Sequence, residues 1–116
     1  MTLNGIAARM VYRIEYSPAS EEHLRVLNAR QRTTVFDTVD EQLAHQPSVE
    51  TRNRKSMRPN SIAPWEIRIG DLRVYYEVVD EPEKRVTILA VGRKDRSRVL
   101  IGGMEVRASA HSGVAG

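Results

Sequence analysis

This chain of 116 residues contains no cysteine, which excludes disulfide bonds, thiolate catalysis and cysteine-ligated zinc. It has no apolar run close to the roughly 18 residues that a membrane-spanning helix needs. Its first ten residues lack the apolar segment of a signal peptide. The glycine-spaced motifs of nucleotide-binding loops and of serine hydrolases are missing as well. We therefore expect a cytoplasmic protein that makes no membrane contact.

Histidine is scarce and scattered. The three histidines, His23, His45 and His111, show none of the paired spacing that is typical of metal ligands. We expect each of them to be an exposed surface residue. The sequence thus predicts neither a metal site nor a cofactor.

The length suits a single domain with one core. The net charge is +3, but the charges are unevenly distributed. Residues 1–51 carry 5 basic and 7 acidic side chains, whereas residues 52–98 carry 12 basic and 7 acidic ones. A basic half beside an acidic half is typical of a face that binds a polyanion. A solvated surface of uneven charge gives the same counts, so both interpretations stay open at this point.

Hydrophobic periodicity predicts one strand and then two helices in the first half of the chain. Residues 11–16 alternate as a strand does. Ser17, followed by proline, is typical of a helix start, and we expect this helix to end near Asn28. A second helix is predicted over residues 30–45, where apolar residues recur every four positions and Pro47 follows.

The second half predicts three strands in succession. Residues 46–64 form a polar, basic connector, after which residues 65–69, 72–79 and 85–91 have strand patterns separated by short turns. The order β-α-α-β-β-β implies an α+β domain in which two helices cover one face of an antiparallel sheet. The other face is left for solvent or a ligand.

We expect this single domain to extend over residues 10–103. Residues 1–9 are predicted to be a flexible N-terminal extension. Residues 104–116 are predicted to be a flexible C-terminal tail, because the periodicity ends after the glycine pair at 102 and 103.

Cations are unusually frequent on the predicted strands. If the turn at residues 70–71 has two residues, Arg68 and Arg73 face each other across the hairpin, where like charges repel. A phosphate bound between them would relieve this repulsion. Neutralisation by Glu66 and Glu77 in a surface ion network is the alternative. Tyrosines 75 and 76 point to opposite faces, so we expect one in the core and the other on the ligand face.

Four segments together resemble the RelE/ParE superfamily of bacterial type II toxins. They are the opening strand with YSPAS, the connector TRNRKSMRP, the hairpin WEIRIGDLRVYYEV and the strand VTILAVGRKDRS. The resemblance implies a small cytoplasmic toxin that a tightly bound antitoxin neutralises. Antitoxin segments are typically acidic and amphipathic, so we expect them to bind the helical hairpin and the sheet rim.

The superfamily divides by target. RelE-like members cut mRNA on the ribosome without a metal, by attack of a ribose 2′-hydroxyl on the adjacent phosphate, whereas ParE-like members poison DNA gyrase. The nuclease positions correspond here to Glu66, Arg68, Arg73, Lys94 and Leu100. Two of them depart from the nuclease pattern, because Glu66 replaces a lysine and Leu100 replaces a tyrosine.

The resemblance makes a ribosome-dependent mRNA endoribonuclease the leading hypothesis. In it, Arg68, Arg73 and Lys94 stabilise the pentacoordinate phosphate, and Glu66 serves as general base. Further cations are expected to hold the RNA backbone: Arg52, Arg54, Lys55, Arg58, Arg93, Arg96 and Arg98. A gyrase poison, and an inactive toxin-like domain that only binds its antitoxin, remain alternatives.

Overall fold

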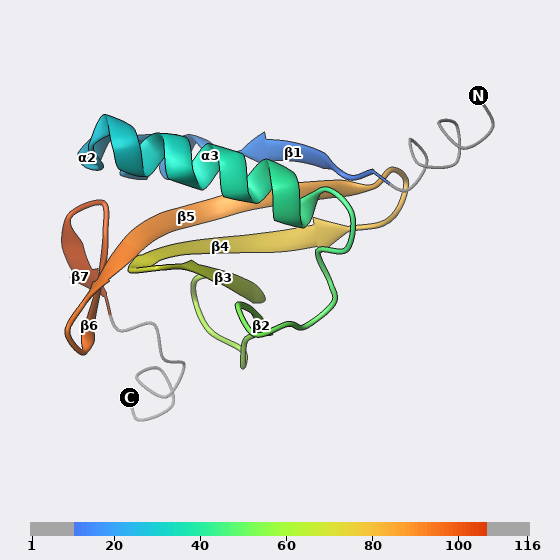
Figure 1. Ribbon diagram of the computed structural model, residues 1–116. Helices are drawn as coiled ribbons and strands as arrows, with labels where there is room; N and C mark the ends of the chain where they lie inside the picture. Colours follow the sequence, from blue (N-terminus) through green and yellow to red (C-terminus); the bar gives the residue numbers. More distant parts are fainter. Residues whose placement is uncertain (1–10, 107–116) are drawn as a thin grey trace.

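The computed structural model describes residues 11–106, which form two helices packed on one face of a seven-stranded sheet (Figure 1). The elements in chain order are β1 (Arg13–Tyr16), α2 (Pro18–Val26), α3 (Ala29–Leu43), β2 (Arg54–Ser56), β3 (Trp65–Ile69), β4 (Leu72–Val79), β5 (Arg85–Asp95), β6 (Arg98–Ile101) and β7 (Met104–Val106). The predicted α+β fold and the β3–β4–β5 meander are confirmed.

Both helices begin at side-chain caps that the sequence supplies. The Ser17 hydroxyl accepts from the Ser20 amide at 3.1 Å at the start of α2. Asn28 and Gln31 exchange two hydrogen bonds, of 2.8 and 2.9 Å, at the start of α3. The inner face of α3 is fully buried against the sheet, as the four-residue spacing predicted, through Val35, Val39 and Leu43.

The first strand differs from the prediction in its direction. The prediction was an entirely antiparallel sheet, but β1 pairs in parallel with the start of β5, from Arg13 opposite Arg85 to Tyr16 opposite Ile88. Parallel pairing requires a long crossover between the two strands. The helical hairpin and the strands that follow it provide one.

The outer edge of β5 is shared by two strands and one helix. β1 ends opposite Ile88, and β6, which runs antiparallel to β5, ends opposite Gly92. At the gap between them, the Ser17 amide donates to the Ile88 carbonyl at 2.9 Å. The Val91 amide donates to His23 Nδ1 at 3.2 Å. His23 is thus half-buried against the sheet, and the prediction that it is an exposed residue is wrong.

The opposite sheet face is also partly covered, where the sequence predicted an open face. Connector and β6–β7 residues pack there around Tyr75 in a second, smaller apolar cluster that includes Met57, Ile62, Ala63, Val99 and Ile101. Tyr76 lies in the main cluster under the helices, and its hydroxyl donates to the Pro47 carbonyl at 2.7 Å. The opposite directions of the two tyrosines and the place of Tyr76 in the core are as predicted, but Tyr75 is fully buried as well.

Three short strands, β2, β6 and β7, lie where the sequence predicted none. β6 follows the last predicted strand and pairs with the end of β5. β2 falls within the connector and pairs antiparallel with Trp65–Ile67. β7 falls within the predicted flexible tail and pairs with β6, because the glycines at 102 and 103 both have positive φ and close a tight turn. The predicted extension at residues 1–9, and the rest of the predicted tail, lie outside the described residues. Within residues 11–106 no helix is both long and apolar enough to cross a bilayer.

His23 predicts a pH-dependent stability. Burial lowers the pKa of His23 below its ordinary value near 6.5, although the charge of Glu22 acts in the opposite direction. The unfolded chain therefore takes up the proton first, and stability is lost as the pH falls below about 6.5. We expect the urea midpoint to fall between pH 7.5 and 5. A His23→Gln variant should lose most of this dependence. His45→Gln, at an exposed position, should keep it, and identical pH curves for all three proteins would contradict the prediction.

Candidate functional site

The register of the β3–β4 hairpin brings the predicted charges together. Arg68 is the cross-strand partner of Arg73, as predicted from the two-residue turn, and Glu66 is the partner of Tyr75. Paired residues of neighbouring strands project from the same face. Glu66, Arg68 and Arg73 therefore share the sheet face that lies away from the two helices.

A β-bulge in β5 adds Lys94 to this group. Tyr76 pairs with Ile88 and Tyr75 with Ala90, so Leu89 is the extra residue of β5. An extra residue reverses the alternation of every side chain that follows it. Beyond the bulge, Gly92 is the partner of Arg73, and Lys94 shares the face of Gly92. Without the bulge, Lys94 would lie on the helix side of the sheet.

The β3–β4 turn holds the site together. The Lys94 amide donates to the Asp71 carbonyl at 2.7 Å, which ties β5 to this turn. Nη1 of Arg73 donates to the carbonyls of Gly70 and Leu72, at 2.8 and 2.9 Å. Arg73 is only 9% exposed, so its guanidinium is fixed against its own turn.

Glu66 neutralises part of the local charge. Its Oε1 accepts from Nε of Arg68 at 3.0 Å, and the two side chains are 11% and 51% exposed. The ion network that the sequence offered as an alternative is therefore present on the Glu66 side. A half-exposed Arg68 still offers its terminal nitrogens to a ligand.

Tyr75 lies on this face beside Glu66, as predicted for one of the two tyrosines, but it was not among the predicted site residues. Burial, and then the neighbouring Glu66 carboxylate, raise the pKa of Tyr75 well above its usual value of 10, while Arg73 and Arg68 act against this rise. Its hydroxyl is buried and makes no hydrogen bond of standard geometry within residues 11–106. The hairpin register alone places Tyr75 beside Glu66, and that signal is present in the sequence.

A groove of about 470 Å³ runs along the edge of β3 beside this pair. Its floor includes Arg68 and Arg73, and its walls come from α3 and the connector, through Thr38, Glu41, Gln42 and Asn53. The groove gives the exposed end of Arg68 an open approach. Its mixed polar lining suits a charged ligand better than an apolar one.

The basic connector residues do not all lie on this face. Lys55 is exposed and is the β2 partner of Glu66, so it extends the site. Arg54 is 8% exposed, and its Nη1 donates to the Gln42 carbonyl at 2.5 Å, in the last turn of α3. Arg54 therefore stabilises the end of the helix, and little of its side chain is exposed for the predicted contact with RNA. Arg52 and Arg58 are exposed.

The cations of the β5–β6 hairpin are divided between the faces. The bulge puts Arg93 on the face opposite Lys94, where its partner is Leu72. Arg98 pairs with Asp95 at 3.1 Å and with Glu105 at 3.8 Å. Arg96 is exposed in the turn with a φ of 61°. The predicted set of Arg93, Arg96 and Arg98 is thus not one surface with Lys94.

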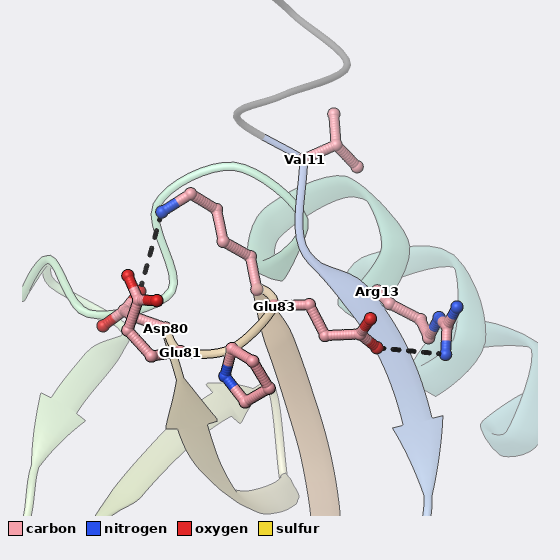
Figure 2. Close-up of a pocket in the computed structure, with 7 residues that line it drawn as sticks. Val11, Arg13, Asp80, Glu81 and Glu83 are labelled. Carbon is pink, nitrogen blue, oxygen red and sulfur yellow. Dashed lines mark ion pairs between the residues drawn. The ribbon is translucent and has the colours of Figure 1, made fainter.

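A second pocket, of about 400 Å³, lies at the opposite end of β4 and β5 (Figure 2). It is lined by the acidic β4–β5 turn and by Arg13. Ion pairs join Arg13 to Glu83 at 3.4 Å and Lys84 to Asp80 at 3.9 Å. These contacts account for most of its charges. Across the described part of the chain, no three histidine or acidic side chains are grouped as metal ligands.

Comparisons with known proteins give one matching family and one similar fold. Residues 14–98 match the family model described as the ParE toxin of the type II toxin–antitoxin system parDE. A solved structure, the toxin–antitoxin complex RelBE2 from Mycobacterium tuberculosis, is similar with a TM-score of 0.63 and 24% identity. That alignment covers 72% of this chain and 99% of the other. Comparison with curated protein sequences gives no significant match.

The neighbouring β2 residues Arg54 and Lys55 allow a test of which of them is buried and which is exposed. Arg54→Ala should lower the free energy of unfolding by about 1–3 kcal/mol, because it leaves a helix-end carbonyl buried without its donor. Lys55→Ala should change stability little, because Lys55 is exposed. Urea denaturation of both variants measures the difference. Equal losses would contradict the assignment of Arg54 to the interior.

Proposed function

The chain belongs to the ParE toxin family of type II toxin–antitoxin systems, and we propose that it is a ribosome-dependent mRNA endoribonuclease that inhibits translation in the cytoplasm. The observation that supports this activity is the convergence of Arg68, Arg73 and Lys94 on one sheet face beside an open groove. Three cations at one place suit a reaction in which charge accumulates on a phosphate.

The proposed reaction forms one bond and breaks one. The ribose 2′-oxygen attacks the adjacent phosphorus in line, and the bond to the 5′-oxygen breaks, which leaves a 2′,3′-cyclic phosphate and a 5′-hydroxyl. Arg68 would meet the non-bridging oxygens, because its guanidinium can contact two of them at once. Lys94, a compact exposed ammonium, would give a proton to the departing 5′-oxygen, and solvent or the ribosome would accept the proton of the 2′-hydroxyl. No metal enters the scheme.

The RNA backbone would follow the same face. Lys55 extends the line of charge from the site toward β2. Arg52 and Arg58 are exposed in the connector, and Arg96 is exposed in the β5–β6 turn. Electrostatic contacts of this kind weaken steeply with salt. We therefore retain these four residues as candidate backbone contacts.

A gyrase poison is the second candidate, and specific observations favour it. Leu100 stands where the nucleases have a tyrosine, and the Glu66 carboxylate is engaged by Arg68. Arg73 is nearly buried against its own turn. A protein that acts only by binding does not need these groups to be free.

Its family also implies that the chain has an antitoxin partner. We propose that the antitoxin covers the helical hairpin, where a groove of about 370 Å³ between α2 and α3 is lined mainly by apolar surface. Phe36 is 40% exposed at this groove, and Arg25 and Arg32 lie beside it. An acidic, amphipathic segment matches both features.

Neighbouring cations on β5 test the nuclease proposal. Lys94→Ala and Arg68→Ala should each reduce mRNA cleavage by about 10²-fold, as removal of a preorganised donor does. Arg93→Ala is the matched control, because the bulge places it on the other face, and its cleavage should stay near that of the parent. Mapping of mRNA 5′ ends after induction measures all three variants. Equal cleavage by Lys94→Ala and the parent would contradict the proposed site.

The same induced cells separate the two candidate targets. A nuclease stops translation and leaves gyrase unaffected. A gyrase poison leaves mRNA intact and accumulates gyrase cleavage complexes together with DNA damage signalling. If neither effect occurs and growth is unchanged, the chain acts only by binding its antitoxin.

A further inference from the structure

Glu66 is the site residue whose role the structure changes most. We propose that Glu66 is a positioning residue, which holds the Arg68 guanidinium in place for a phosphate, and that it does not act as the general base. This inference rests on the proposed phosphodiester chemistry of the site. It assigns a role within that chemistry to one carboxylate.

The surroundings of Glu66 are those of a held side chain. Its side chain is 11% exposed, and its carboxylate already accepts from Nε of Arg68 at 3.0 Å. Its strand partners are Lys55 on one side and Tyr75 on the other. A general base must come within about 2.6–3.2 Å of the hydroxyl that it deprotonates. Little of this carboxylate is open to such an approach.

Arg68 needs such an anchor because its cross-strand partner carries the same charge. Arg73 is fixed by the carbonyls of Gly70 and Leu72. The Arg68 side chain bonds to Glu66 and not to carbonyls of the turn. Without that bond, repulsion from Arg73 would turn this long side chain toward solvent. The bond from Nε to Glu66 opposes this movement. It leaves the terminal nitrogens directed at a ligand, in a side chain that is 51% exposed.

Tyr75 supports the same role from β4. Burial and the Glu66 charge raise the pKa of Tyr75, so its hydroxyl keeps its proton. A protonated hydroxyl beside a carboxylate can donate to it after a small movement. Glu66 then has a buried donor behind it and Arg68 in front, which is the arrangement of an orienting group.

Two substitutions at one position separate the roles. Glu66→Gln and Glu66→Ala both remove the negative charge, so they alter the electrostatic attraction for phosphate equally. Only Gln keeps an oxygen that accepts from Arg68. If Glu66 is a base, both variants lose its function. If Glu66 is a positioning residue, Gln largely takes over its role and Ala does not. Glu77→Gln, on the same face of β4, is the control for removal of a charge.

The direct measurement is the NMR signal of the Arg68 Nε–H group. We expect slow hydrogen exchange at this group in the parent, in Glu66→Gln and in Glu77→Gln, and fast exchange in Glu66→Ala. Titration with inorganic phosphate should then show about 2- to 10-fold tighter binding to Glu66→Gln than to Glu66→Ala. Equal exchange rates at Arg68 in all four proteins would overturn the positioning role, whether or not phosphate binds.

Cleavage of mRNA provides the second measurement. With Glu66 as a positioning residue, Glu66→Gln stays within about tenfold of the parent, since a neutral acceptor keeps roughly half the strength of a charged one. Glu66→Ala loses about 10²-fold through misplacement of Arg68. If Glu66→Gln instead loses about 10²–10⁴-fold and the acidic limb of the pH profile disappears, Glu66 is the base. A parent that cleaves no mRNA refutes the proposed function, and the exchange rates at Arg68 still decide the role of Glu66.

Discussion

The structure depends on the pairing of β5, which pairs with three other strands and contacts the first helix. Along one edge it pairs with β4 over its first nine residues, and along the other it pairs with β1 and then β6. The gap between β1 and β6 is bridged by Ser17 and His23 from the first helix. The first strand, the first helix, the meander and the C-terminal hairpin are therefore all positioned by one strand.

The bulge in this strand connects the fold to the site. One extra residue, Leu89, reverses the alternation beyond it, so that Lys94 joins Arg68 and Arg73 while Arg93 faces the other way. Gly92 makes the arrangement possible, because a Cβ there would lie 2.3 Å from the Leu100 carbonyl oxygen. The backbone geometry of β5 thus determines that Lys94, and not Arg93, lies on the face of Arg68 and Arg73.

The segments that cover the second sheet face help to explain the ion pair between Glu66 and Arg68. The connector and the β6–β7 hairpin bury Tyr75, and the neighbouring Glu66 side chain, 11% exposed, contacts Arg68. A salt bridge this close to a buried face is less screened than one at the surface. The like-charged pair of Arg68 and Arg73 is therefore tolerable without a bound anion. The same contact restricts the chemistry that Glu66 can perform.

The sequence by itself determined the helices, the meander and the Arg68–Arg73 pair, because caps, periodicity and a two-residue turn are local features. It also placed Glu66 on their face. Only the tertiary structure decided the parallel direction of β1, the burial of Arg54 and the face of Lys94. These depend on contacts between segments distant in the chain and on a bulge that leaves no mark in an apolar run. Register over several strands is a property of the whole sheet.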